Sequence, residues 1–434
     1  MENTVYDRIA QHIDENAEGA PKSKGTYSKA FIEYLKLLYT PEEANLVQYL
    51  SSPHEILPST LDPENYLTAG QIAALSGVNI YEVKRILEGV AQRGAIASTG
   101  SMMRGSPIES MRRLTQVVRM FLKAAGLKGT LKSLSSIVKR TFTDIINYKL
   151  FTRSGFDMAM YALPYMPLLV NAHHFYEDLR PDDLKAAALY QQFFIKEGFY
   201  KYYESSEEGT PVMKVVPVET TIHPRQRILN LEEAHKIIDA SVNVALAPCP
   251  CRTRTEKLGI RECKARNPVG CCIMLGFSSI FFESSGLGRK VTKDEAKQYL
   301  DQMQKAGLVA TTDNWDYSPH SIICLCCECC CSQIRGRTRW ENPSSLRPSN
   351  FIPQSDANCI ACGQCVKRCF FGALSVDVEL KRSIVDENKC IGCGVCTITC
   401  KQKSLRLIRL ERSESIPTSR ALYDRILAEN KKLK

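Results

Sequence analysis

Apolar residues recur at helical spacing through the first fifty positions of the chain, which predicts short amphipathic helices. Residues 5–15 form the first of them, and a second begins near Tyr27. The four residues that start at Thr40 read TPEE, which combines an N-cap, a first-turn proline and the glutamate of a capping box. This motif predicts a third helix.

The stretch from Thr68 to Ser98 has the pattern of helix, glycine turn, helix and strand. Thr68 and Asn79 are each placed to cap a helix, and Gly77 separates the two. The apolar run after Gly94 could begin a strand. This order is typical of a winged helix-turn-helix. The exposed face of the second helix carries two carboxylates, which disfavour binding to phosphate. Winged helices also serve as protein-docking modules, so the fold does not decide between the two roles.

The basic segment 111–153 holds ten Lys or Arg residues and a single acidic residue, Asp144. Its apolar residues fall on one helical face, so one interpretation is a helix that packs in its own domain. The alternative is a helix that docks on an acidic protein or a membrane surface.

The composition is that of a globular protein, with 44% apolar and 24% charged residues among 434 and a net charge of +10. The N-terminus lacks an apolar signal region. The longest nearly apolar run, 158–170, is too short to span a bilayer and contains two prolines. We therefore expect a cytoplasmic protein, either free or peripheral at the inner face of the membrane.

The chain has nineteen cysteines, which fall in three groups. Because no secretory signal accompanies them, these cysteines favour metal binding over disulfide pairing. The last group reads CIACGQCVKRC from Cys359 and CIGCGVCTITC from Cys390. Three thiolates on a short loop can bind three corners of an iron–sulfur cubane, and the fourth cysteine of each run binds the other cluster. The expected ligand sets are Cys359, Cys362, Cys365 with Cys400, and Cys390, Cys393, Cys396 with Cys369. Zinc or disulfides are the alternatives, but structural zinc favours paired knuckles.

This segment resembles the bacterial ferredoxin domain with two [4Fe–4S] clusters. Ala373-Leu374 and Ser404-Leu405 stand where that family has a short strand after each loop. Phe370 and Lys401 stand where it often has proline. Proline is not a ligand, so this departure concerns loop rigidity and reduction potential.

The other two cysteine groups lie in the middle of the chain and hold eleven cysteines. Two cubanes would use eight of them, and the rest could be neighbouring thiols, a bridge in a larger cluster or a substrate-binding thiolate. A zinc-binding, metallothionein-like site is the other interpretation. The candidate metal ligands are Cys249, Cys251, Cys263, Cys271, Cys324, Cys326, Cys327, Cys329 and Cys330.

A second resemblance covers most of the chain. The chain is similar to a poorly characterised family of multi-cluster iron–sulfur proteins of anaerobes. Members of this family are usually labelled 4Fe-4S ferredoxin and have an N-terminal winged-helix-like domain. The matching motifs are the C-P-C-R run at Cys249, the single cysteines Cys263 and Cys271, the run Cys324–Cys331 and YTPEEA at Tyr39. The family implies electron transfer and supplies no substrate.

These patterns predict an α+β chain with a mostly helical N-terminal part, a cysteine-rich middle domain and a C-terminal ferredoxin-like domain with two [4Fe–4S] clusters. The predicted domains are 1–103, helical and winged-helix-like; 104–155, a basic helical insertion; 156–348, helical and cysteine-rich with additional clusters; 349–410, the ferredoxin domain; and 411–434, a basic helical tail.

No Walker A motif and no complete dinucleotide fingerprint occur, so we expect the clusters to perform the chemistry. The leading hypothesis is an electron-transfer protein with two [4Fe–4S] clusters in the ferredoxin domain and two more in the middle, serving as a subunit or partner of an anaerobic oxidoreductase. Its partners would be a redox donor and a redox acceptor. The alternatives are an iron–sulfur reductase with its active-site cluster at Cys324–Cys331, and a redox-sensing DNA-binding regulator.

Overall fold

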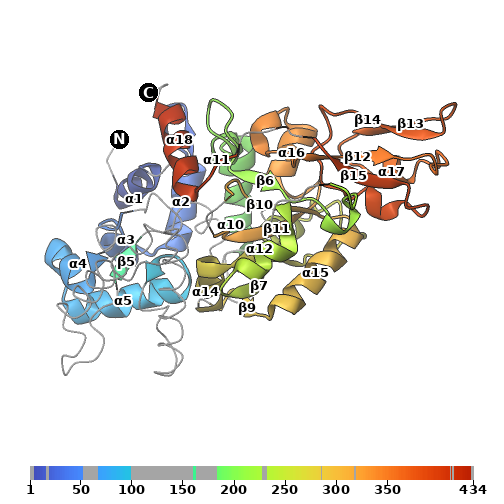
Figure 1. The fold of residues 1–434 in the computed structure, drawn as a ribbon. Helices are drawn as coiled ribbons and strands as arrows, with labels where there is room; N and C mark the ends of the chain where they lie inside the picture. Colours follow the sequence, from blue (N-terminus) through green and yellow to red (C-terminus); the bar gives the residue numbers. More distant parts are fainter. Residues whose placement is uncertain are drawn as a thin grey trace. The chain divides into compact units, whose positions relative to one another are not determined.

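The computed structural model describes the chain in two compact units (Figure 1). Unit 1 comprises Met1–Asp182 with Ile280–Leu287, and unit 2 comprises Asp183–Ser279 with Gly288–Lys434. The described residues are 4–15, 19–51, 67–98, 160–162, 183–226, 232–284, 286–316, 319–410, 412 and 415–431. The predicted insertion 104–155 and its basic segment 111–153 lie outside these residues.

Unit 1 begins with three helices, α1 (Val5–Asp14), α2 (Lys29–Leu38) and α3 (Pro41–Val47). Their apolar faces are fully buried, and a short hairpin of β1 (Lys22–Ser23) and β2 (Thr26–Tyr27) joins the first two. The capping box at Thr40 is formed on both sides: the Thr40 hydroxyl accepts from the Glu43 N–H, and the Glu43 carboxylate accepts from the Thr40 N–H. Local capping therefore determines where these helices start.

The next part of unit 1 pairs α4 (Ala69–Ser76) with α5 (Ile80–Gln92). Gly77 adopts a left-handed conformation, φ 72°, which ends α4 and turns the chain into α5. A three-stranded sheet in the order β3 (Leu67–Thr68), β5 (Met160–Ala162) and β4 (Ala97–Ser98) accompanies the two helices. The partner of β4 is thus a strand more than sixty positions further along the chain, which the sequence pattern did not reveal.

Unit 2 is built on a six-stranded sheet in which every neighbouring pair is antiparallel. Its strands in spatial order are β6 (Met213–Val215), β10 (Val309–Asp313), β11 (Ile322–Cys326), β8 (Cys271–Leu275), β7 (Val244–Pro248) and β9 (Arg289–Lys290). The central strands β11, β8 and β7 carry or adjoin most of the middle cysteines.

The two faces of this sheet pack into separate apolar clusters. On one face, Ile273, Ile323 and Leu325 pack against α12 (Ala234–Ala240) and α15 (Lys293–Ala306), and we call this the α15 face. On the other, Val309 and Cys326 pack against α16 (Ser332–Arg339), and we call this the α16 face. Because side chains alternate along a strand, neighbouring cysteines are sent to opposite faces.

Two small two-stranded antiparallel sheets flank the C-terminal cysteine loops along the chain. The strand β12 (Phe351–Ser355) pairs with β15 (Leu405–Arg409), and β13 (Leu374–Asp377) pairs with β14 (Arg382–Val385). The strands β13 and β15 follow the first and second cysteine loops, at the positions where the sequence placed short strands. A short helix, α17 (Gln364–Arg368), and a 3-10 turn, Thr397–Thr399, occupy equivalent places in the two loops.

The remaining described helices surround the sheet or close the chain. In the stretch 411–434, which the sequence predicted to be a basic tail, the structure has α18 (Ser419–Lys431) with Leu422, Tyr423 and Ile426 buried. No helix within the described ranges is long and apolar enough to cross a membrane. The other helical elements are α10 (Asp183–Tyr190), a π-helical turn Gln191–Lys196, α11 (Tyr200–Glu204), α13 (Pro250–Lys257), α14 (Gly276–Ser284) and the 3-10 turns Glu219–Thr221 and Pro343–Ser345.

Candidate metal centres

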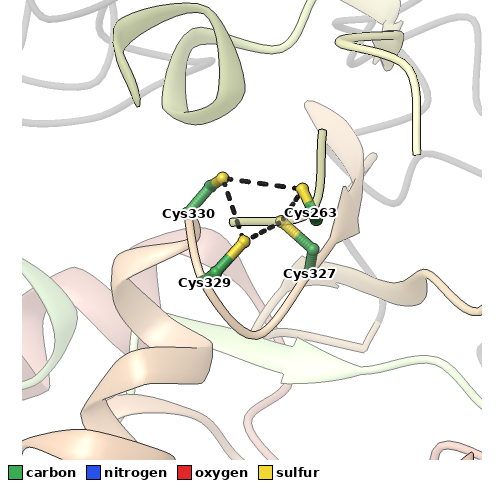
Figure 2. Close-up of side chains that lie close together, drawn as sticks. All are labelled: Cys263, Cys327, Cys329 and Cys330. Carbon is green, nitrogen blue, oxygen red and sulfur yellow. Dashed lines mark hydrogen bonds between the residues drawn. The ribbon is translucent and has the colours of Figure 1, made fainter. Parts of the chain in front are cut away.

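Four buried thiols converge on one point in unit 2 (Figure 2). They are Cys263, Cys327, Cys329 and Cys330, and their sulfur atoms all lie within 4.8 Å of one another. The Sγ–Sγ distances are 3.8 Å for Cys263–Cys327, 3.9 Å for Cys263–Cys330, 3.9 Å for Cys327–Cys329 and 3.4 Å for Cys329–Cys330. We call this group the four-thiol site.

The four-thiol site is formed by the turn that leads from β11 into α16. Figure 2 shows Cys327, Cys329 and Cys330 on this turn, with Cys263 reaching in from another loop. The Thr255 hydroxyl lies 3.1 Å from the Cys330 sulfur. The turn ends at Cys331, which is the N-cap residue of α16. The other three thiols donate to the Cys327 sulfur, which lowers the pKa of Cys327 far below the ordinary thiol value. The same contacts, together with burial, raise the pKa values of Cys263, Cys329 and Cys330, so the site favours a single thiolate at Cys327.

A second group of thiols in unit 2 forms a ring. Each of its members has two thiol neighbours, and contacts run around it in the order Cys249, Cys251, Cys331, Cys326, Cys324, Cys272 and back to Cys249. Four of the six are buried and two are half-buried. Hydrogen bonds from the Cys324 and Cys331 thiols lower the pKa of Cys326 to about 6. We call this group the six-thiol ring.

Arg252 lies beside both groups with 1% of its surface exposed. Its guanidinium donates to the carbonyl oxygens of Val269 and Leu325, the latter at 2.5 Å. Although burial opposes its charge, the nearby sulfurs of Cys249, Cys272 and other cysteines raise the pKa of Arg252. This buried positive charge offsets the charge of thiolates and of any cluster that they hold.

The other basic residues of this region differ in what they face. Arg254 is also buried and lies over the Tyr190 ring, 4.7 Å from its centre. By contrast, Arg261 and Lys264 pair with Glu256, and Arg266 pairs with Glu328. The structure thus directs Arg252 and Arg254 inward and pairs Arg261, Lys264 and Arg266 with carboxylates.

The second ferredoxin set lines a pocket. Cys369, Cys390, Cys393 and Cys396 all border it, together with apolar residues that include Phe370 and Phe371. Burial raises the pKa of Cys393 to about 12, and the Cys369 sulfur acts electrostatically on all three other thiols. A pocket bordered by four thiols from two loops has the donor set that a [4Fe–4S] cluster requires, so these residues fit the group.

The first ferredoxin set is nearer the surface. Cys362 is exposed, and Cys359, Cys365 and Cys400 are half-buried. The sulfurs of Cys359 and Cys362 act electrostatically on Cys365, and Cys365 and Cys400 pack against the same small apolar cluster. The two sites therefore differ in solvent access, with the second set the more deeply placed.

The six-thiol ring adjoins the second ferredoxin set across the α16 face. Cys326 and Cys331 belong to one packed cluster with Ile391 and Val395, and Cys324 and Cys393 pack against the same cluster. The Val218 N–H donates to the Cys393 carbonyl at 3.0 Å, which ties this loop to the sheet. The six-thiol ring and the second ferredoxin set therefore border one shared apolar cluster.

The structure groups the middle cysteines differently from the sequence-based set. That set included Cys271 and left out Cys272 and Cys331. In the structure, Cys272 and Cys331 belong to the ring, while Cys271 packs on the α15 face, where its N–H donates to the Tyr299 hydroxyl at 2.6 Å. Side chains alternate between the two faces of the sheet along β8, so Cys272 faces away from Ile273 while Cys271 lies on the same face as Ile273. This alternation is the feature of the sequence that distinguishes Cys271 from Cys272.

The cysteine-lined sites and the pattern of the two C-terminal loops define a ferredoxin-type iron–sulfur protein. The chain is similar to the polyferredoxin-like subunit of an aliphatic sulfonate oxidoreductase from Pyrococcus furiosus, with 34% identity over 88 residues, 19% of this chain and 51% of that protein. It is also similar to a subunit of an ion-translocating oxidoreductase complex from Methanosarcina acetivorans, with 38% identity over 52 residues, 12% of this chain and 19% of that one. The chain thus spans about half the length of the first relative and a fifth of the second. No family model and no solved structure matches it.

Proposed function

We propose that this chain is a multi-cluster electron-transfer protein and that it acts as a subunit or partner of an anaerobic oxidoreductase. The observation that carries this proposal is the continuity of the sulfur-lined sites: ring cysteines and Cys393 share one apolar cluster on the α16 face. The two relatives named above are themselves subunits of oxidoreductases, which supports the assignment.

The cysteines divide into proposed ligand sets, and the clusters that they hold supply one-electron transfer. The residues of the chain keep these sites apart from water and tune them: Arg252 adds positive charge, and Phe370 and Phe371 border the second ferredoxin set. The proposed cluster-binding sets are Cys359, Cys362, Cys365 and Cys400, and Cys390, Cys393, Cys396 and Cys369. The four-thiol site, with sulfurs 3.4–3.9 Å apart, instead has the spacing of a single tetrahedral metal ion.

The difference in exposure suggests where electrons enter or leave. The first ferredoxin set contains the exposed Cys362, whereas the second set and the six-thiol ring are more deeply placed. We infer that a protein partner docks near the first ferredoxin set. Electrons would then pass between this partner and the six-thiol ring through the second ferredoxin set. A cytoplasmic or membrane-peripheral location is compatible with this role, and the donor and acceptor would be redox proteins.

The two alternatives have weaker support. A reductase with its active site at Cys324–Cys331 would need substrate access, but each of these six cysteines is buried or half-buried. A DNA-binding regulator would use α5, whose exposed residues include Glu82 and Glu88. These carboxylates repel phosphate.

The proposal is tested by an anaerobic reductive titration of the full chain with iron and sulfide analysis. We expect a brown protein that takes up several electrons per chain reversibly, and returns them to a redox dye. A colourless preparation, a zinc protein, or one whose iron cannot be reduced and reoxidised would refute electron transfer.

Replacing Cys362 with alanine is expected to remove about four irons per chain. Because the first set is the exposed one, electron transfer to a protein acceptor should fall at least tenfold, while a small dye still reduces the deeper sites. The measurement compares both rates in stopped-flow experiments. Cys271→Ala is the matched control, since it removes a thiol outside every proposed set. Equal protein-acceptor rates in the two variants would show that electrons do not leave through the first set.

A further inference from the structure

The sulfurs of the four-thiol site are spaced for one metal ion. A tetrahedral ion with metal–sulfur bonds of about 2.3 Å holds its four ligands about 3.8 Å apart. The four sulfur–sulfur distances around the site run from 3.4 to 3.9 Å. A cubane is bound at its four outward corners, around irons and sulfides that fill its centre, so its protein ligands must stand further apart than this. The site therefore has room for one ion and not for a cluster.

The arrangement of these sulfurs is tetrahedral, not flat. The four distances join them in a closed circuit that runs from Cys263 to Cys327, Cys329, Cys330 and back (Figure 2). In a flat set with sides of these lengths, a diagonal would measure more than about 5 Å. Every sulfur of the site, however, lies within 4.8 Å of every other. This is the geometry that zinc takes, and it differs from the square plane that Cu(II) and Ni(II) prefer.

The four-thiol site is closed to water and has polar support. Each of its four cysteines has at most 3% of its surface exposed. The Thr255 hydroxyl lies 3.1 Å from the Cys330 sulfur, and a guanidinium nitrogen of the buried Arg254 lies 3.5 Å from the Cys330 carbonyl oxygen. Four thiolates around a divalent ion carry a net negative charge, which a buried cation at this turn offsets.

The site lies off the route proposed for electrons. Its four cysteines pack among the apolar residues of the α15 face. Cys326 and Cys331 pack on the α16 face instead, against the apolar cluster that Cys393 of the second ferredoxin set also contacts. Alternation at the end of β11 sends Cys326 and Cys327 to opposite faces. The sheet thus stands between the four-thiol site and the sulfurs proposed to carry electrons, so an ion without redox chemistry fits this position.

An ion at this site would fasten an irregular segment to the sheet. Residues 258–270, between the end of α13 and the start of β8, form neither helix nor strand, and Cys263 lies among them. The other three ligands follow β11 directly. A shared ion would join Cys263 to Cys327, which is 64 positions further along the chain. Because the unfolded chain has no preformed site, the binding free energy of such an ion stabilises the fold.

We propose that the four-thiol site holds one zinc ion, bound by Cys263, Cys327, Cys329 and Cys330 without sulfide, and that this ion is structural. The thiols release their protons as the ion binds. Zinc forms closed tetrahedral sites with four cysteines and has no redox chemistry of its own. For a given set of donors it also binds more tightly than Fe²⁺. The inference does not depend on the proposed function, which needs clusters only at the other cysteines.

The test measures zinc and iron in the full chain, purified without oxygen. The native chain should hold about one zinc, and Cys263→Ala should lose it while keeping all of its iron. The retained iron shows that the variant has folded. Cys271→Ala is the matched control, because it removes a half-buried thiol outside the site, and it should keep the zinc.

Three results of the metal analysis would each overturn the proposal. Loss of about four irons from Cys263→Ala would mean a cubane, and loss of about one would mean a single iron ion. A native chain without zinc would mean that the thiols bind none.

A second measurement uses no variant. Zinc X-ray absorption of the native chain should show about four sulfur neighbours at about 2.3 Å. Nitrogen or oxygen neighbours in place of sulfur would identify zinc bound elsewhere on the protein and would overturn the proposal.

Limited proteolysis tests the structural role. Trypsin can cut the irregular segment after Arg261, Lys264 and Arg266. Loss of the ion in Cys263→Ala should raise cleavage there at least about tenfold, because the segment opens more often, whereas Cys271→Ala should be cut like the native chain. Equal cleavage of native chain and Cys263→Ala would refute the structural role.

The outcomes for zinc and for electron transfer are separable. A chain that holds this zinc but fails the reductive titration would refute electron transfer and leave the zinc site standing. A chain that passes the titration without zinc would do the reverse.

Discussion

Replacing Arg252 with methionine is expected to destabilise unit 2 by about 3–5 kcal/mol, the range for removing one partner of a buried charge interaction. The guanidinium is almost fully buried and donates to the carbonyl oxygens of Val269 and Leu325. Methionine would fill much of the volume but leave both carbonyls without their donor and the cysteines without their nearest positive charge. Chemical denaturation under anaerobic conditions measures the loss.

If the middle cysteines hold redox-active iron, as we propose, the same substitution should lower its reduction potential. Reduction adds negative charge, so removal of a neighbouring cation disfavours the reduced state. The matched control is Arg266→Met, because the Arg266 side chain is exposed and its pairing with Glu328 lies at the surface. That change is expected to cost about 1 kcal/mol or less. If both variants gave the same unfolding midpoint and potential, the role assigned to Arg252 would be wrong.

Replacing Gly392 with alanine is expected to abolish the second ferredoxin site, whereas Gly363→Ala should be tolerated. The two glycines flank the second cysteine of their loops, Gly392 just before Cys393 and Gly363 just after Cys362, and they have nearly the same φ, +70° and +69°. The cost of placing a side chain in the left-handed region, about 1–2 kcal/mol, is therefore common to both. Only the surroundings differ.

A Cβ at Gly392 would lie 2.2 Å from the Ser349 hydroxyl and 2.3 Å from the Phe351 carbonyl oxygen, which is backbone in β12. Among the residues that the structure describes, no heavy atom lies within 4 Å of a Cβ built at Gly363. We therefore expect Gly392→Ala to lose about four irons and most of its soluble yield, and Gly363→Ala to keep its full iron content. Iron analysis and thermal unfolding of both proteins decide the matter. Equal loss in the two would mean that backbone strain, not packing, controls the loops.

Local signals in the sequence predicted much of this structure. The capping box at Thr40, the glycine turn at Gly77 and the strand after each C-terminal cysteine loop each depend on a few neighbouring residues, and the structure has these features. The pairing of β4 with β5 depends on residues more than sixty positions apart, so it left no local pattern. The winged-helix interpretation, the domain boundaries and the ligand sets stay predictions.

The grouping of the middle cysteines could not be predicted from spacing, for a physical reason. The two ferredoxin sets are specified mainly within short loops, whereas the six-thiol ring takes its members from two helix starts and from strands that meet only when the sheet has formed. Pairing of β8 with β11 decides that Cys272 and not Cys271 joins the ring. Alternation along a strand was readable in the sequence, but the identity of the neighbouring strand was not.

The unequal shielding of the two ferredoxin sets has a practical consequence for anyone who handles the protein. Dioxygen reaches the loop of the exposed Cys362 before it reaches the pocket of the buried Cys390 and Cys396. Bleaching in air should then proceed in stages. The brown colour that survives the first minutes should come from the second ferredoxin set, which is the more deeply buried of the two. A sample judged intact by its colour can already have lost the first ferredoxin set, where we propose that a partner docks.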